Sequence, residues 1–377
     1  MAENKEKKVL NVPNLRFPGF EGEWEKKRLG DFTERVKRKN KYNLSKLPLT
    51  ISAKYGLVDQ ITFFNKIVAS TDMSNYYLLK KGEFAYNKSY SNDYPWGAIK
   101  RLDNYEQGVL SALYICFTTQ DNVESDFILQ YFESPKWHKS VSEIAVEGAR
   151  NHGLLNISVQ NFFQTYHYVP KEKKEQTKIA TLLHLIDERI ATQNKIIEDL
   201  KKLKCAIIDY TIETLQTDYI DFSEVYDMAG EGGTPSTSNM EYYENGCIPF
   251  VKIEDLKQKY LVSNKDHITE LGLQKSSAWL IPTNSILFSN GATIGEISIT
   301  TYPVCTKQGI LGIVPKVNFD TEYLYYLMSS RYFKREICRI ITEGTMKTAY
   351  LKDINKIRCP IPSKAIQQEI VSLPSVL

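Results

Sequence analysis

The stretch that decides the fold is 171-KEKKEQTKIATLLHLIDERIATQNKIIEDLKKLKCAIIDYTIETLQ-216. It contains neither proline nor glycine, and Pro170 stands just before it, where a helix tolerates proline. Its apolar residues recur in steps of three, four and seven, which is typical of an amphipathic helix with a near-heptad seam. The seam residues are Ile179, Leu182, Leu183, Ile186, Ile190, Ile197, Leu200, Leu203 and Ile207. We predict a helix over 171–217, roughly 65 Å long, whose seam a partner helix in this chain or another must cover.

The sequence repeats itself on either side of this helix. Asp31-Phe32-Thr33-Glu34 returns as Asp221-Phe222-Ser223-Glu224, at an offset of 190 residues. Further matches in the same order have offsets between 191 and 196: Asp126-Phe127-Ile128 with Glu322-Tyr323-Leu324, Glu147-Gly148 with Glu343-Gly344, Val169-Pro170 with Ile361-Pro362, and Gln176 with Gln367. Internal repeats of this kind decide architecture. We therefore expect an α+β chain with two similar mixed α/β domains in tandem.

Composition sets the protein class. The 377 residues are 42% hydrophobic and 25% charged, which suits two or three globular domains. The formal net charge of +3 neither requires nor excludes a nucleic-acid partner. No apolar run approaches the length of a membrane span, and the start, MAENKEKKVL, lacks a signal-peptide pattern. Six scattered cysteines without a CxxC pair, and five scattered histidines, favour reduced thiols in a cytoplasmic protein without a metal site.

Motifs for catalysis are missing from the sequence. There is no phosphate-cradling GxxxxGK[ST] loop, no glycine-rich turn followed by an Asn-Pro-Pro-aromatic or Asp-Pro-Pro-aromatic corner, and no Pro-Pro dipeptide at all. The nearest candidate for a metal-dependent nuclease, Glu254-Asp255-Leu256-Lys257, has no second acidic partner at a recognisable spacing. The chain is therefore expected to bind rather than to catalyse.

The two copies share a frame but differ in their loops. In the first copy we predict a helix over Asp126–Phe132, a turn around Asn161-Phe162-Phe163, and strands at Leu47–Ala53, Phe84–Tyr86, Gly97–Lys100, Leu110–Phe117 and Leu154–Val159. The second copy carries its own turns at Gly232–Ser236, Asn290–Gly295 and Cys305–Gly309. A common scaffold with different loops predicts two modules that read two different ligands.

These features resemble the specificity subunit of type I restriction-modification systems. The first copy matches at Trp24, Leu29-Gly30-Asp31, Gly108–Ser111 with Leu113-Tyr114, Gly148 with Arg150, and Pro170 with Glu175-Gln176 and Lys178-Ile179, continued by Leu185-Ile186-Asp187 and Ile190. The second matches at Gly232–Ser236, Thr293-Ile294-Gly295, Gln308-Gly309-Ile310, Leu351 with Ile354, and Pro360 with Pro362. The resemblance covers nearly the whole chain, and the doubled helix-opening motif is its most specific part.

The resemblance implies a division into four parts and a set of partners. The parts are a first target recognition domain (1–170), a spacer helix (171–217), a second target recognition domain (218–362) and the start of a second conserved helix (363–377). Each recognition domain would read one half of a split DNA site. The chain would recruit two modification subunits, which bind S-adenosylmethionine, and restriction subunits, which use ATP and Mg²⁺. It would hold no cofactor of its own.

Candidate DNA contacts follow from loop chemistry, since basic side chains bind phosphates and polar ones read base edges. In the first domain they are Lys88, Ser89, Tyr90, Arg150, Asn151 and His152. In the second they are Thr234, Ser236, Lys252, Asn290, Thr293, Lys307 and Gln308. Each of these can instead be a turn or capping residue without a DNA contact. The local surplus of five positive charges over 25–41 is equally open, as a phosphate-facing patch or as a solvated face.

The second long helix of the family pattern is expected to be truncated here, because the sequence ends at Leu377 and Pro374 breaks helices. The seam would then lack an in-chain partner, and the isolated chain is expected to self-associate. Two rival interpretations stay open. One is a coiled-coil scaffold that binds only proteins, and the other is a self-contained nuclease-methylase that binds S-adenosylmethionine itself.

Overall fold

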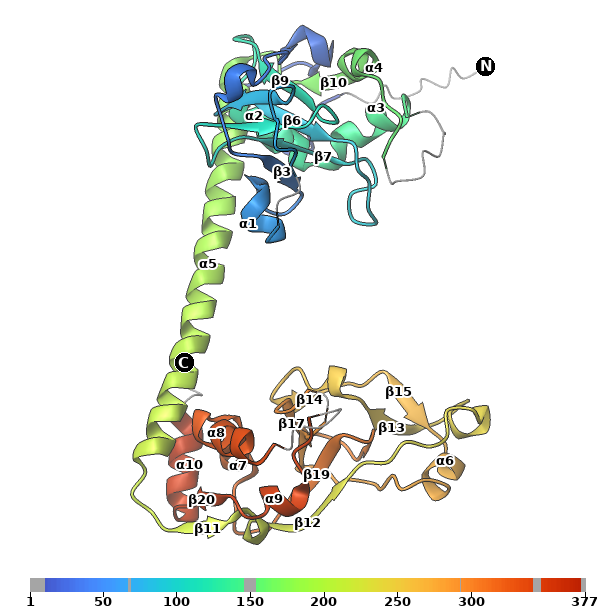
Figure 1. Cartoon of the computed structure of the whole chain (residues 1–377), viewed down its shortest axis with the longest axis vertical. Helices are drawn as coiled ribbons and strands as arrows, with labels where there is room; N and C mark the ends of the chain where they lie inside the picture. The colour runs from blue at the N-terminus through green and yellow to red at the C-terminus, as the bar shows by residue number, and fades with distance from the viewer. Residues whose placement is uncertain (1–10, 67–68, 146–153, 292, 342–346, 374–377) are drawn as a thin grey trace, which may run out of the picture. The chain divides into compact units, whose positions relative to one another are not determined.

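The computed structural model describes residues 11–66, 69–145, 154–291, 293–341 and 347–373. The chain forms two compact units, Met1–Thr192 (unit 1) and Gln193–Leu377 (unit 2), and helix α5 (Lys173–Thr214) contributes to both (Figure 1). The prediction of one uninterrupted helix between two mixed α/β domains is confirmed. Each unit is described on its own below.

Unit 1 is built on a four-stranded antiparallel sheet in the order β2-β9-β6-β7, with three two-stranded pairs, β1-β10, β3-β4 and β5-β8, around it. Its strands are β1 (Glu25–Arg28), β2 (Thr33–Arg35), β3 (Leu49–Ser52), β4 (Gly56–Asp59), β5 (Tyr77–Lys80), β6 (Phe84–Asn87), β7 (Ala98–Arg101), β8 (Gln107–Leu110), β9 (Ile115–Thr119) and β10 (Tyr166–Val169). Its helices before α5 are α1 (Gln60–Phe64), α2 (Ser125–Glu133), α3 (His138–Ser142) and α4 (Val159–Gln164), with 3₁₀ turns η1 (Leu29–Asp31), η2 (Lys41–Asn43) and η3 (Pro135–Trp137).

Unit 2 repeats this plan on a five-stranded sheet in the order β12-β19-β16-β17-β14, with the smaller sheets β15-β13-β18 and β11-β20. Its strands are β11 (Tyr219–Asp221), β12 (Tyr226–Glu231), β13 (Ile248–Val251), β14 (Tyr260–Leu261), β15 (Asp266–Ile268), β16 (Ile286–Ser289), β17 (Ile297–Thr300), β18 (Cys305–Thr306), β19 (Ile310–Pro315) and β20 (Arg358–Pro360). Its helices are α6 (Glu270–Gln274), α7 (Thr321–Ser329), α8 (Arg331–Ile340), α9 (Leu351–Ile354) and α10 (Lys364–Ser372), with 3₁₀ turns η4 (Phe222–Glu224), η5 (Met240–Tyr242) and η6 (Ile253–Asp255).

The predicted internal repeat is confirmed by strand order, because β2-β9-β6-β7 of unit 1 corresponds to β12-β19-β16-β17 of unit 2. It is confirmed again by one pair of buried glutamines. The Gln176 side chain accepts a hydrogen bond from the Glu124 backbone N–H (2.7 Å) and donates one to the Pro170 carbonyl (2.8 Å). In unit 2, Gln367 makes the same two bonds, to the Asp320 N–H (2.8 Å) and the Pro362 carbonyl (2.8 Å). In each unit the glutamine fixes the helix that follows the domain to the start of α2 or α7.

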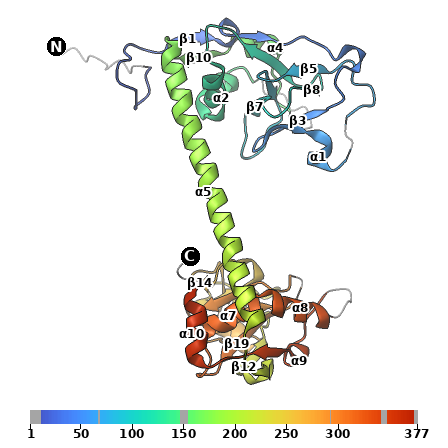
Figure 2. The same ribbon diagram turned by 90° about the vertical axis from the view of Figure 1, so that its left-hand side faces the viewer.

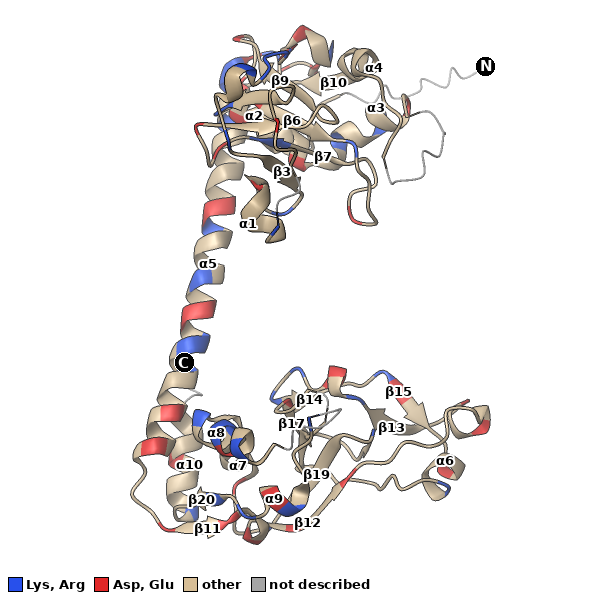
Figure 3. Cartoon of the chain, in the orientation of Figure 1, with Lys and Arg blue, Asp and Glu red and all other residues tan. Residues whose placement is uncertain are grey.

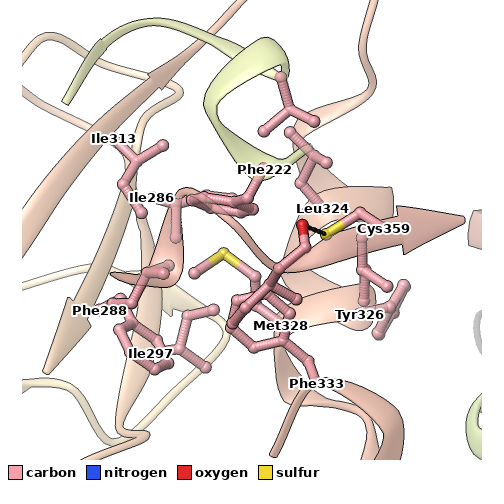
Figure 4. Close-up of a cluster of buried hydrophobic side chains, with 14 of the residues drawn as sticks. Phe222, Ile286, Phe288, Ile297, Ile313, Leu324, Tyr326, Met328, Phe333 and Cys359 are labelled. Atoms are coloured by element: carbon pink, nitrogen blue, oxygen red, sulfur yellow. Dashed lines mark hydrogen bonds between the residues drawn. The ribbon is translucent and has the colours of Figure 1, made fainter. Parts of the chain in front are cut away.

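The cores lie between the central sheet of each unit and the helices after it. In unit 1 the core is aromatic, with Phe84 stacked on Phe117 (ring centroids 5.2 Å apart) and Tyr86 stacked on Phe162 (4.8 Å). In unit 2, Figure 4 shows Ile286, Ile297 and Ile313 of the sheet meeting side chains of α7 and α8. Burial of these apolar side chains is the main stabilising contribution in both units.

Two strand predictions in unit 1 are wrong. The apolar run over 110–117 is not one strand, because a turn over Ser111–Tyr114 separates β8, which pairs with β5, from β9, which pairs with β2 and β6. Residues 154–159 hold isolated bridge positions at Leu154 and Asn156 instead of a strand, with Leu154 paired to Ser89. Ser158 then caps helix α4 by accepting from the Asn161 N–H (3.0 Å). The turn predicted around residue 162 is therefore part of that helix.

The predicted seam of α5 is largely open to solvent. The side chains of Ile190, Ile197 and Leu203 are 54%, 49% and 47% exposed, and Leu182, Ile186 and Leu200 lie between 39% and 46%. Ile179, Leu183 and Ile207 are partly buried. The fully buried residues of α5 lie near its two ends: Glu175, Gln176, Ala180, Ile208 and Ile212. Lys, Arg, Asp and Glu alternate along the middle of the helix (Figure 3).

Candidate nucleic-acid interface

A polar hollow in unit 2 has a volume of about 600 Å³. It lies where several loops of the unit converge. Its lining residues are Glu231, Thr234, Lys252, Ile253, Glu254, Gly291, Lys307, Gln308, Gly309, Thr348 and Tyr350. Four of the seven residues that the sequence suggested for this domain, Thr234, Lys252, Lys307 and Gln308, therefore share one site.

Hydrogen bonds from backbone N–H groups to side-chain oxygens hold the loops of this hollow together. The carboxylate of Glu231, at the end of β12, accepts a hydrogen bond from the Gly309 N–H (3.0 Å). The Thr234 hydroxyl accepts one from the Gln308 N–H (3.3 Å). Gly309 has φ of +93°, a conformation that favours glycine. These bonds fix the turn between β18 and β19, so that Lys307 and Gln308 stay exposed beside the exit of β12.

Lys252, which lines the hollow, forms an ion pair with Asp266. Its ammonium lies 2.8 Å from a carboxylate oxygen of Asp266, and that hydrogen bond raises the pKa of Lys252. Both side chains are about a third exposed, so the pair is solvated and its energetic contribution small. The pairing instead restrains the long lysine side chain at the rim of the hollow.

Asn290, which the sequence suggested as a DNA contact, is buried beside the hollow and does not line it. It is 2% exposed, and its backbone carbonyl accepts from the Ala349 N–H (2.9 Å) while its side-chain amide donates to the Ala349 carbonyl (3.2 Å). Asn290 thus anchors the segment that presents Thr348 and Tyr350 to the hollow. The two remaining candidates of this unit, Ser236 and Thr293, are exposed but do not line it.

The corresponding place in unit 1 is the end of β6. The Lys88 carbonyl accepts from the Leu155 N–H (2.9 Å), as the Asn290 carbonyl accepts from Ala349 in unit 2. The Lys88 ammonium reaches the Ile157 carbonyl (3.5 Å), and Ser89 and Tyr90 are exposed, Tyr90 by 54%. The candidates Arg150, Asn151 and His152 lie outside the described residues.

The remaining polar and aromatic residues that line the unit 2 hollow were missed by the sequence analysis: Glu231, Glu254, Thr348 and Tyr350. Glu254 was considered only as a nuclease carboxylate. Glu231 and Tyr350 belong to no motif, and only the convergence of their loops identifies them. Together the lining residues offer ammonium, amide and hydroxyl donors beside carboxylate acceptors. This mixture suits hydrogen bonding to an array of donors and acceptors such as the edges of base pairs.

Other kinds of site find less support in the described residues. Within them, no group of three or more His, Cys, Asp or Glu side chains is placed to hold a metal ion. None of their helices combines the length and the apolar character that crossing a membrane requires.

Comparisons with known proteins find a family model and relatives that match part of the chain. Residues 219–374 match the family model "Type I restriction modification DNA specificity domain". The type I restriction enzyme MjaIX specificity subunit of Methanocaldococcus jannaschii is 31% identical over 155 residues, which are 40% of this chain and 35% of that relative. The chain thus matches about a third of that protein's length.

Two solved structures share the fold across nearly the whole chain. One, described as the structural basis of complex assembly and conformational transition of the type I R-M system, has a TM-score of 0.61 at 17% identity and covers 97% of this chain and 91% of that one. The other, the HsdS subunit from Thermoanaerobacter tengcongensis, has a TM-score of 0.50 at 17% identity, with 98% and 91% covered.

Proposed function

We propose, because the chain belongs to the family of type I restriction-modification specificity subunits, that it recognises a DNA site in two parts. Each unit reads one half. The observation that carries this proposal is the hollow of unit 2, where four residues suggested by the sequence, from three separate loops, lie together. In unit 1 the counterpart is the surface at Lys88, Ser89 and Tyr90.

The residues of the hollow have complementary roles in this reading. Lys252 and Lys307 bind phosphates and fix the register of the unit on the duplex. Gln308 and Thr234 donate to and accept from base edges, and the Glu231 carboxylate accepts from an exocyclic amino group such as that of cytosine. Asn290 is a positioning residue, which holds the backbone of the loop beside it.

Assembly uses the exposed seam of α5. Its half-exposed isoleucines and leucines would be covered by two modification subunits, which bring S-adenosylmethionine, and restriction subunits then join with ATP and Mg²⁺. Under this proposal the chain holds no cofactor and catalyses nothing, and the complex acts on DNA in the cytoplasm. The length of α5 sets the gap between the two half-sites.

A binding experiment tests the role of the hollow. The full chain is combined with its modification subunits and a duplex that carries the site mapped by genomic methylation, and binding is compared with a shuffled duplex. We expect Gln308→Ala to lower the preference for the mapped site by roughly 1–3 kcal/mol, because one base-edge contact is lost. Lys257→Gln is the matched control, since Lys257 is exposed in the same unit and does not line the hollow. An equal loss in both variants, or none in Gln308→Ala, contradicts the proposed role.

A protein-binding scaffold is the second candidate function, because the same exposed seam of α5 suits it. The wild-type complex separates the two. A scaffold captures the modification subunits but binds the mapped and the shuffled duplex equally.

A further inference from the structure

A strongly basic segment of unit 1 plays no part in the site described so far. Between Arg35 and Lys66 the chain has eight Lys and Arg residues and a single acid, Asp59, although the whole protein carries a net charge of only +3. Some of these cations have structural partners, as Arg38 has in Glu83 (2.6 Å). Five exposed lysines have no carboxylate within ion-pairing distance among the described residues: Lys37, Lys41, Lys46, Lys54 and Lys66.

The same segment exposes aromatic and aliphatic side chains on α1. Ile61, Phe63 and Phe64 are 41–45% exposed, and the two phenylalanine rings lie edge to face with centroids 5.1 Å apart. Their exposure is built into the fold. The Asp59 carboxylate caps the helix by accepting from the Ile61 N–H (3.0 Å), and the Gln60 N–H donates to the Pro48 carbonyl (2.8 Å).

A second exposed ring comes from the loop before β3. Tyr42 is 93% exposed, and it and Asn43 have φ of +60° and +52°, which non-glycine residues adopt at an energetic cost. The buried side chain of Asn40 holds this loop through two hydrogen bonds to the backbone of Ser45, both 2.9 Å long. The fold therefore maintains a strained turn that presents a tyrosine between Lys41 and Lys46.

This surface lies apart from the exposed seam of helix α5. β3 and α1 lie on the side of unit 1 away from helix α5 (Figure 2). The surface is therefore separate from the seam proposed for partner subunits. The segment thus combines exposed lysines that lack a carboxylate partner with exposed rings. This combination fits a polyanion that also has apolar edges, which describes duplex DNA and not an apolar protein face.

We infer that residues 40–66 bind duplex DNA next to the half-site read by unit 1, without reading its bases. Lys54 and Lys66 contact phosphates, and Phe63 and Phe64 pack against the apolar faces of sugars along a groove. This inference rests on the proposed function, because it assumes that unit 1 is held on DNA.

The salt dependence of binding tests the lysine contacts. The full chain with its modification subunits is titrated with the mapped duplex and with the shuffled duplex, between about 50 and 200 mM salt. In a Lys54→Gln/Lys66→Gln variant we expect the slope of log Kd against log salt to fall by about 2, equally on both duplexes. The control is Lys81→Gln/Lys139→Gln, which removes two exposed lysines elsewhere on unit 1 and should leave the slope unchanged.

The ring contacts have their own test. Phe63→Ser/Phe64→Ser should weaken binding to both duplexes roughly tenfold, and Phe63→Leu/Phe64→Leu should restore most of it because the apolar area is kept. An unchanged salt slope in the lysine variant, or a serine variant that binds DNA normally but loses the modification subunits, overturns the inference. If the wild type binds both duplexes equally, the proposed sequence recognition fails, while a slope that still depends on Lys54 and Lys66 upholds this contact.

Discussion

Substitution of the paired glutamines tests the internal repeat through its energetics. Gln176 is 2% exposed, and Gln176→Leu leaves the partly buried Glu124 N–H and the buried Pro170 carbonyl without a partner. A buried polar group without a partner costs about 1–3 kcal/mol. The two groups together would cost roughly 2–6 kcal/mol. Relaxation around the leucine recovers part of that cost, so we expect the unfolding free energy of unit 1 to fall by roughly 2–4 kcal/mol. The same reasoning applies to Gln367→Leu in unit 2, where Gln367 is 1% exposed.

Hydrogen exchange measured by mass spectrometry under increasing denaturant reports the two units separately. Gln176→Leu should destabilise the peptides of unit 1 and leave those of unit 2 unchanged, and Gln367→Leu should do the reverse. Gln164→Leu is the control, because Gln164 is exposed on α4 and its loss should cost about 0.5 kcal/mol or less. A cost below that level in either glutamine variant, or destabilisation of both units by one substitution, refutes the reasoning.

Three further predictions concern unit 1 and helix α5. Burial lowers the pKa of His167 from 6.5 to about 4. Because the unfolded chain binds the proton more readily than the folded one, the unfolding free energy of unit 1 should fall by roughly 3 kcal/mol as the pH drops from 6.5 to 4. Urea unfolding of His167→Phe should lack that part of the pH dependence. Glu175→Ala removes the carboxylate that binds the Arg16 guanidinium through two bonds (2.7 and 2.8 Å), so amide exchange over 11–24 should accelerate, and unchanged protection would contradict the role of this pair. Insertion of four residues after Asn194 should lengthen the gap between the methylated half-sites, and a constant gap would mean that α5 does not set it.

The sequence was informative where periodicity and repetition are strong. Spacing in the sequence predicts the long helix, because helix packing imposes regular positions on apolar residues. Spacing also predicts the two-domain plan and the equivalence of Gln176 in unit 1 and Gln367 in unit 2. Boundaries inside unit 1 were harder to predict. The apolar run over 110–117 serves two strands of different sheets, and only the pairing partners show where the chain turns.

The candidate site was predictable only in part, for a related reason. Polar residues in glycine-containing turns, such as Thr234 and Gln308, stand out in the sequence, and the fold brings them together. Tyr350 enters the same hollow because buried Asn290 holds the neighbouring residue, a contact across 59 positions that no local pattern encodes. Likewise, exposed rings on α1 look in the sequence like core residues, since an apolar side chain carries no mark of the face it will occupy.

Mapping of methylated DNA after exchange of one unit tests the central claim most directly. Cells that carry the modification subunits receive either this chain or a version in which residues 218–362 come from another member of the family. If each unit reads its own half of the site, the exchange changes one half-site and keeps the other half and the gap. Methylation in which both halves change together, or in which neither changes, would contradict independent reading by the two units.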